Sequence, residues 1–249
     1  MRTFVMGDIH GAYQALTECL QRSGFDYLED TLIQLGDIAD SGDRVYECVE
    51  ELLRIKNLIA VRGNHDEWFL QFIQSGYHPQ AWFGGGQGTA ISYLRRIGKE
   101  ELILYTPSGY YTALNPGDIP ETHKRFFRGQ HLYHIDDENN CFVHAGFDRH
   151  QPFKGQTPEV YYWNRDLWVQ AMSWETYNKH QRQKGKFQMV TPFREIFIGH
   201  TSTINWATDK PIHAANIYNI DTGASHSGRL TIMDVATKEF WQSEIVKRG

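Results

Sequence analysis

The stretch Phe4-Val5-Met6-Gly7-Asp8-Ile9-His10-Gly11 joins a short apolar run to a cluster of polar and turn-forming residues. Apolar runs bounded by turn residues are typical of buried strands. The same pattern recurs at residues 32–37, 58–66, 141–146, 196–201 and 217–223. Ligand groups in α/β folds lie just beyond the carboxyl ends of strands. We therefore expect these polar clusters to share one site.

Amphipathic helical patterns separate the early strands. Apolar residues recur at helical spacing after the first strand and again before the third, at Ala12, Ala15, Leu16, Cys19 and Leu20, and at Val45, Cys48, Val49, Leu52 and Leu53. This strand–helix alternation predicts a partly parallel sheet. Residues 229–235 and 239–246 instead resemble a closing β-hairpin or meander. The expected fold class is α/β, a sandwich of two mixed β-sheets with helices outside.

The segment 67–130 interrupts the core pattern. It is rich in aromatic residues and glycine, and has helical patterns near 89–97 and 120–127. We expect it to form a helical flap beside the site. Because no repeat, low-complexity tract or linker is visible, residues 1–249 are expected to form a single domain.

Composition narrows the class of protein. The formal net charge of −5 over 249 residues argues against a protein that wraps duplex nucleic acid. Three sparse cysteines fit a reducing cytoplasm better than a disulfide framework. No apolar run approaches the ~20 residues that span a bilayer, and the N-terminus lacks the long apolar stretch of a secretory signal. We expect a cytoplasmic protein.

The polar clusters contain metal-ligand residue types. They hold histidine, aspartate and asparagine but no cysteine. Carboxylate and imidazole donors suit Mn, Fe or Zn in a catalytic site rather than a closed structural zinc site. Six such residues exceed the needs of one metal, but suit two metals ~3.5–4 Å apart that share a carboxylate.

The ordered motifs GDIHG (7–11), GDIADSG (36–42), RGNHD (62–66), HAG (144–146) and GHT (199–201) resemble those of the metallophosphoesterases. The resemblance is closest to the phosphoprotein phosphatase branch, which includes bacterial and phage Ser/Thr phosphatases and symmetrical diadenosine tetraphosphatases. It covers nearly the whole chain. It implies a bacterial-type enzyme with two divalent metal ions, Mn²⁺ being favoured and Fe or Zn remaining open.

The resemblance also implies roles for residues. It assigns the first metal to Asp8 and His10, the bridging position to Asp37, and the second metal to Asn64, His144 and His200. His65 would be the general acid, and Asp40 would hold its orientation. This agrees with chemistry, because a protonated imidazole near two cations needs a carboxylate to keep its charge.

Arginine binds phosphate well because its planar fork matches two phosphate oxygens. Arg62 and Arg165 match phosphate-binding arginines of the family. Many members carry a third arginine in GDxxDRG, where this chain has Ser41. Arg44 either replaces that arginine or is a solvated helix residue, and both readings stay open.

Another stretch resembles a W…GG..T pattern of bacterial members, at Trp82, Gly85, Gly86 and Thr89. Amides near Gly88 and Thr89, at the start of a helix, could contact a leaving group. A packing role is the favoured interpretation.

The implied activity is phosphomonoester hydrolysis by a metal-bridging hydroxide, with His65 protonating the leaving oxygen. The expected substrate is phosphoserine or phosphothreonine on a protein, or a small phosphoester. A dinucleoside polyphosphate hydrolase is the main alternative. A nucleic-acid end phosphatase or phosphodiesterase is disfavoured by the charge. A binding module that has lost catalysis is disfavoured because the six ligands and His65 are all present.

Overall fold

The computed structural model describes residues 1–78, 82, 85–107, 109–181 and 189–247. One five-stranded sheet has the order β12 (Phe240–Gln242), β11 (Thr231–Asp234), β1 (Thr3–Met6), β2 (Thr31–Gln34) and β3 (Asn57–Ala60). β1, β2 and β3 are parallel, whereas β11 pairs antiparallel with both β1 and β12. The sequence prediction of a closing antiparallel hairpin is thereby confirmed.

The second five-stranded sheet has the order β6 (Tyr133–Ile135), β7 (Cys141–Val143), β8 (Ile196–Ile198), β10 (Ile217–Asn219) and β9 (Ile212–Ala214). Its three central strands, β7, β8 and β10, are parallel, and both edge strands are antiparallel to their neighbours. Both sheets are therefore mixed, as the sequence predicts.

A buried apolar layer joins the two sheets. Val5 and Ile33 from the first sheet pack with Phe142, Phe197 and Ile220 of the second-sheet segments. The Phe142 and Phe197 rings stack at a centroid distance of 4.9 Å. Face-to-face packing of this kind is that of a sandwich, so the two sets of parallel strand ends meet along one edge.

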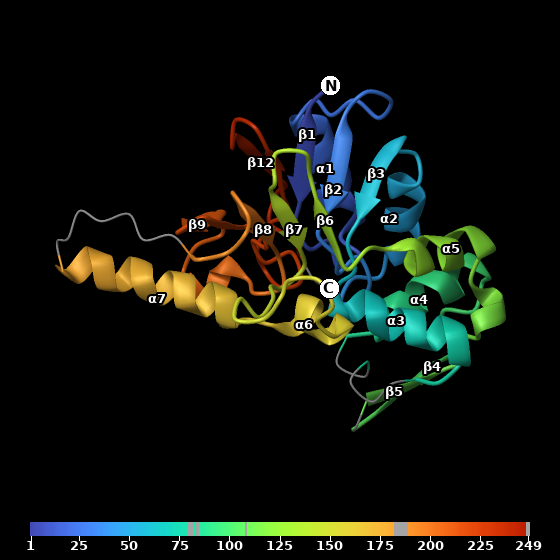
Figure 1. The fold of residues 1–249 in the computed structure, drawn as a ribbon. Helices are drawn as coiled ribbons and strands as arrows, with labels where there is room; N and C mark the ends of the chain where they lie inside the picture. Colours follow the sequence, from blue (N-terminus) through green and yellow to red (C-terminus); the bar gives the residue numbers. More distant parts are fainter. Residues whose placement is uncertain (79–81, 83–84, 108, 182–188, 248–249) are drawn as a thin grey trace.

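Helices cover the outer faces (Figure 1). α1 (Tyr13–Arg22) and α2 (Val45–Leu52) pack their apolar sides against the first sheet. α6 (Pro158–Trp163) and α7 (Asp166–Gln181) belong to the apolar cluster of the second sheet. None of the helices in the described ranges is long and apolar enough to span a membrane.

The segment 67–130 lies beyond the carboxyl ends of the first sheet's parallel strands (Figure 1). It contains most of α3 (Asn64–Ser75), with α4 (Gln87–Arg96), the 3₁₀ turn η2 (Pro116–Asp118) and α5 (Glu121–Gly129). The helices expected near 89–97 and 120–127 are thus present. A hairpin of β4 (Ile103–Thr106) and β5 (Gly109–Thr112), which the sequence analysis did not predict, projects from it.

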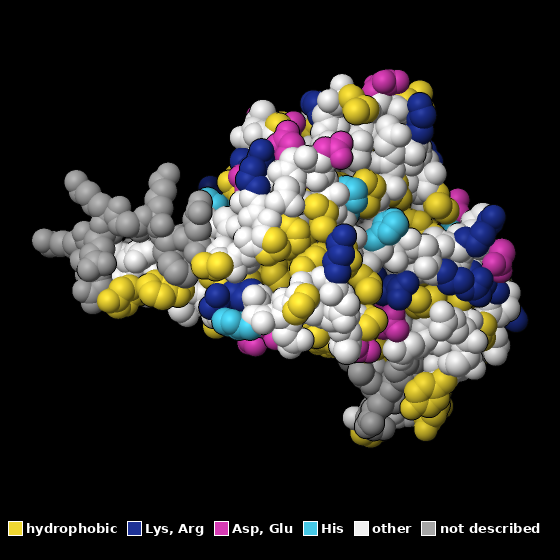
Figure 2. Space-filling model, viewed as in Figure 1, with side chains coloured by type: hydrophobic (Ala, Val, Ile, Leu, Met, Phe, Trp, Pro, Cys, Tyr) yellow, Lys and Arg dark blue, Asp and Glu magenta, His cyan; other side chains and the backbone are white. Residues whose placement is uncertain are grey.

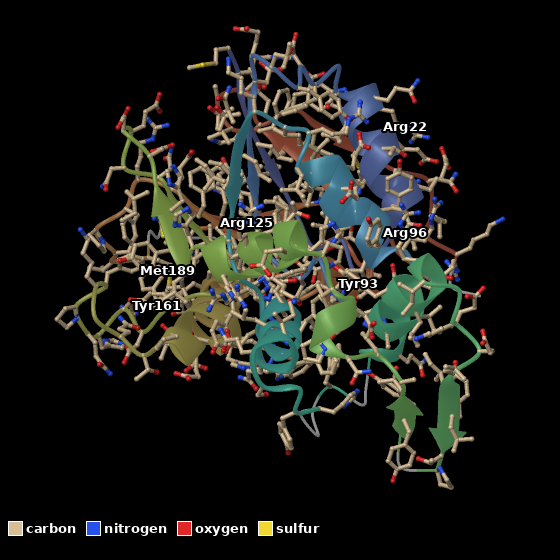
Figure 3. The ribbon with its side chains drawn as sticks, turned by 90° about the vertical axis from the view of Figure 1, so that its right-hand side faces the viewer. Arg22, Tyr93, Arg96, Arg125, Tyr161 and Met189 are labelled. Atoms are coloured by element: carbon tan, nitrogen blue, oxygen red, sulfur yellow. The ribbon has the colours of Figure 1, made fainter. Side chains whose placement is uncertain are left out.

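The segment 67–130, which we call the insertion, shares one apolar core with α2 and the first sheet. Tyr93 of α4 lies between α2 and α5 in the side view (Figure 3). Its hydroxyl is 2.8 Å from His123 Nδ1, and His123 Nε2 is 2.7 Å from Glu50 on α2. These bonds fix the insertion to the helix layer of the first sheet.

Candidate active site

The candidate ligands follow the carboxyl ends of strands from both sheets. Asp8 and His10 follow β1, Asp37 follows β2, and Asn64 opens α3 after β3. From the second sheet, His144 follows β7 and His200 follows β8. Figure 2 shows histidine side chains, together with Lys or Arg side chains, near the centre of the face where β6, α3 and α6 meet.

Asp37 is shared by two groups of donor atoms. His10, Asp37 and His65 form one group, and Asp37, His144 and His200 form the other, with the donor atoms of each group within 4.8 Å of one another. Asp37 Oδ2 lies 3.6 Å from His10 Nε2 and 3.4 Å from His144 Nε2. A carboxylate between two donor groups is the arrangement that two neighbouring cations need.

The remaining candidate ligands lie beside these groups. The His200 amide donates to Asp8 Oδ2 at 3.0 Å, which holds the two sheets' ligands together. Asp8 Oδ1 and His200 Nε2 are both buried, and neither has a hydrogen-bond partner among the described residues. Asn64 Oδ1 is 3.2 Å from His144 Nε2. Buried polar atoms are ordinarily satisfied, so orphan donor atoms at this point fit a site that takes cations.

Backbone carbonyls orient two of the imidazoles. His10 Nδ1 is 3.1 Å from the Ala39 carbonyl, and His144 Nδ1 is 2.7 Å from the Leu35 carbonyl. When these Nδ1–H groups donate, the Nε2 lone pairs face the centre of the site. Metal-binding histidines are commonly held in this way.

The chain reaches this geometry through an unusual backbone. His10, Asp37 and His200 have positive φ angles of 49°, 52° and 64°. Non-glycine residues adopt this region rarely, and such strain concentrates at functional sites. At Gly63, a Cβ atom would lie 2.0 Å from Asp37 Oδ1, so only glycine allows the loop after β3 to approach this carboxylate.

Burial and mutual charge shift the pKa values of the site. Burial and the neighbouring Asp221 and Asp37 raise the pKa of Asp8 well above its usual range. Burial opposes ionisation of Asp37, but the imidazoles of His144 and His65 hold its pKa well below the usual range. Burial and the charge of His144 lower the pKa of His200 to about 2. Divalent cations would relieve this repulsion among buried carboxylates.

His65 and Asp40 form a hydrogen-bonded pair. His65 Nδ1 is 2.7 Å from Asp40 Oδ2, and the His65 amide donates to Asp37 Oδ1 at 2.9 Å. Burial lowers the pKa of the imidazole, but the Asp37 and Asp40 carboxylates outweigh it and raise the pKa to about 9. The structure therefore places the His65 imidazole beside two carboxylates that favour its protonated form.

The three candidate arginines differ in position. Arg62 is mostly buried, donates to Glu67 at 3.0 Å and points toward carbonyls at the end of α5. Arg165 is exposed, 5.8 Å from the Trp163 ring, and its charge contributes to the lowered pKa of His200. Arg44 stacks on Tyr13 at 4.5 Å and lines a groove of about 740 Å³ between α1, α4 and residues 244–247.

Two further buried carboxylates, for which the motifs indicated no role, lie beside the candidate ligands. Asp66, the last residue of RGNHD, accepts hydrogen bonds from the amides of Ile38, Ala39 and Gly63 and from Gln130 Nε2. It thereby ties the loop after β2 to the start of α3. Asp221, after β10, is buried beside Asp8 and accepts the Gly223 amide. The sequence feature that could have indicated Asp221 was its place in the polar cluster at residues 217–223.

The amino-acid sequence is similar to a known protein family and to named members of it. The family model described as Calcineurin-like phosphoesterase matches residues 1–204. "Serine/threonine-protein phosphatase 1" of Salmonella typhimurium is 25% identical over 229 residues, 92% of this chain and 89% of the relative. A symmetrical bis(5'-nucleosyl)-tetraphosphatase of Aggregatibacter actinomycetemcomitans is 35% identical over 305 residues, 100% of this chain and 99% of the relative.

Solved structures share the fold. A metallophosphoesterase from Sphaerobacter thermophilus superposes with a TM-score of 0.52 at 17% identity, covering 100% of this chain and 90% of that structure. The chain belongs to the calcineurin-like phosphoesterase family. It is a hydrolase of phosphoester bonds, in a family that uses divalent metal ions.

Replacing Asp66 tests its role in connecting the loop after β2 to the start of α3. Asp66→Ala leaves the amides of Ile38 and Ala39 buried without an acceptor. Since each orphaned buried donor costs about 1–3 kcal/mol, we expect the free energy of unfolding to fall by about 2–5 kcal/mol. Urea denaturation measures this change, with exposed Asp137→Ala as the control. Equal stability of the two variants would show that the Asp66 bonds are not important for the fold.

Proposed function

We propose that the chain is a dinuclear metal-dependent phosphomonoesterase that acts on phosphoserine or phosphothreonine in proteins. The observation that carries this proposal is the shared Asp37 carboxylate between two donor groups. Asp8, His10 and Asp37 would hold one cation, and Asn64, His144 and His200 would hold the other together with Asp37. Two cations there supply Lewis-acid activation of water and neutralise phosphate charge. The oxygen and nitrogen donor set supports Mn²⁺.

His65 performs general-acid catalysis in this proposal. Its Nδ1 is engaged by Asp40, which leaves Nε2 to donate a proton to the leaving oxygen. His65 also falls within the first donor group, beside His10 and Asp37. A carboxylate on Nδ1 favours the protonated imidazole that the acid role needs, and the metal content of His65→Asn distinguishes this role from a ligand role.

Arg62 and Arg165 would bind the phosphoryl oxygens. Arg62 is oriented by Glu67, and Arg165 lies on Trp163 beside His200. The position of Arg44 on Tyr13 supports its reading as a helix-start residue, with Ser41 marking a loss of the third arginine. The reducing cytoplasm is the proposed location, supported by three buried free thiols.

A second candidate is hydrolysis of a dinucleoside tetraphosphate. The observation in its favour is a tryptophan wall, Trp68 and Trp163, that runs from His65 to His200. The Trp68 ring is 4.6 Å from His65 and 5.6 Å from Trp163, and Trp163 is 5.4 Å from His200. Trp163 is 37% exposed. Aromatic faces beside a phosphate site suit nucleobases, which stack on them.

Metal removal tests the dinuclear centre. We expect chelation to abolish phosphatase activity and Mn²⁺ to restore it, because the bound cations activate the attacking water. The wild-type chain should bind two equivalents of Mn²⁺ by titration calorimetry. Asp37→Asn should weaken binding at both positions about 10–100-fold or more, whereas exposed Asp137→Asn should bind normally. Full turnover by the metal-free chain would contradict the mechanism.

The acid role of His65 predicts a dependence on the leaving group. General-acid catalysis contributes typically ~10²–10⁴-fold, and matters most when an alkoxide must leave. His65→Asn should therefore lose about 100-fold or more in kcat/KM on a phosphoserine peptide and much less on p-nitrophenyl phosphate, which expels a stable phenolate. Metal content should be retained, and exposed His150→Asn should be unaffected. Equal losses on both substrates would remove His65 from this role.

The substrate class is tested by direct comparison. With Mn²⁺ present, we expect a higher kcat/KM on phosphoserine peptides than on diadenosine tetraphosphate. Trp68→Leu is the companion variant, and exposed Trp174→Leu is its control. Preference for the dinucleotide, with a loss of about 10-fold in Trp68→Leu as expected for one stacked base, would reverse the order of the two candidates.

A further inference from the structure

The two carboxylate oxygens of Asp40 have separate partners. Oδ2 faces His65 Nδ1 at 2.7 Å. Oδ1 accepts two hydrogen bonds, from Trp82 Nε1 at 2.6 Å and from the Thr89 hydroxyl at 2.7 Å. The Thr89 hydroxyl oxygen in turn accepts the Asp40 amide at 2.8 Å. Asp40, Trp82 and Thr89 are all fully buried, so these bonds are shielded from water.

Both donors to Oδ1 come from the insertion, whereas Asp40 and His65 come from the sheet core. Further contacts join the two parts at this point. The Ser41 amide donates to the Gly85 carbonyl at 2.9 Å. A Cβ atom on Gly85 would lie 3.4 Å from Asp40 Cβ and 3.7 Å from His65 Cε1. The insertion therefore packs directly against the His65–Asp40 pair.

The spacing of these residues has a structural reason. Gly86 precedes α4 at its N-cap, and a Cβ atom there would lie 2.3 Å from the Trp82 indole nitrogen. The glycine lets the indole lie against the helix start, from which Thr89 reaches the same carboxylate oxygen. The W…GG..T pattern, for which the sequence favours a packing role, thus forms a two-donor clamp on Asp40.

A carboxylate bonded at one oxygen only can rotate about its Cβ–Cγ bond. Two fixed donors on Oδ1 restrict that rotation and keep Oδ2 directed at His65. Asp40 itself has a strained positive φ of 73°, which surrounding bonds must maintain. Orientation of a proton-transfer group within a fraction of an ångström governs its catalytic contribution.

We infer that Trp82 and Thr89 are positioning residues for the general acid, acting on His65 through Asp40. The insertion therefore completes the acid step of the reaction, while the metal-binding donors belong to the sheet core. This inference rests on the proposed phosphomonoesterase function, because it needs a leaving group that His65 protonates.

The first test compares leaving groups in variants that remove one donor each. Trp82→Phe keeps an aromatic ring but removes the indole N–H, and Thr89→Val keeps the shape without the hydroxyl. By analogy with lost outer-shell partners, we expect each to lose about 10-fold or more in kcat/KM on a phosphoserine peptide, with only a minor loss on p-nitrophenyl phosphate. Thr89→Ser restores the hydroxyl and should recover activity. Trp168→Phe is the matched control, because Trp168 is equally buried and its indole nitrogen has no partner.

The second test combines these changes with His65→Asn. If Trp82 and Thr89 act through the acid, their effect on phosphoserine hydrolysis should disappear in that background, since coupled residues are non-additive. A structural role would instead give the same loss with and without His65. Equal losses on both substrates, or additive losses in the double variants, would overturn the inference.

A third measurement does not depend on turnover. In the Mg²⁺-loaded chain labelled with ¹⁵N-tryptophan, the Trp82 indole resonance is assigned by its absence in Trp82→Phe. We expect the Trp82 indole N–H to exchange slowly with solvent. We also expect its resonance to shift in Asp40→Asn. Rapid exchange, or no response to Asp40→Asn, would show that the clamp is absent. If the wild-type chain hydrolysed no phosphomonoester while the indole bond was present, the proposed function would fail separately from the clamp.

Discussion

Buried negative charge is the constraint on which the rest of this structure depends. Asp8, Asp37, Asp66 and Asp221 each expose 4% of their surface or less, and they gather at one edge of the two sheets. Carboxylates cannot remain ionised in such a place without amides, imidazoles or cations around them. Backbone amides donate hydrogen bonds to Asp66, and neighbouring imidazoles lower the pKa of Asp37. Within the described residues, one Asp8 oxygen has no hydrogen-bond partner, which fits the proposed cation site.

Much of this arrangement was predictable from local sequence. The strands with polar residues at their carboxyl ends are short apolar runs interrupted sharply by glycine, so periodicity and turn chemistry both locate them. The helices around 12–20 and 45–53 carry clear apolar spacing. The expectation that these polar residues share one site follows from their positions, because parallel strands place their carboxyl ends together.

Other features could not be predicted, either because the local pattern is weak or because they depend on contacts between distant segments. The β4–β5 hairpin has Leu104, Tyr105 and Tyr111 exposed. Its two short strands do not alternate between apolar and polar residues, so the sequence does not indicate them. Trp82 and Thr89 look like ordinary packing residues until the fold brings Asp40 beside them. Arg44 is adjacent in sequence to the motif and stacks on Tyr13 instead. For Trp82, Thr89 and Arg44 the deciding partner lies many residues away.

The bond between the His200 amide and Asp8 spans 192 residues. Closing so long a loop has an entropic cost that is recovered only when the sheets have packed. The candidate metal ligands on the first sheet can therefore meet those that follow β7 and β8 only after the two sheets have packed. A ribosome-bound chain that ends before His200 lacks this bond, so the proposed metal site can form only after residue 200 has been synthesised.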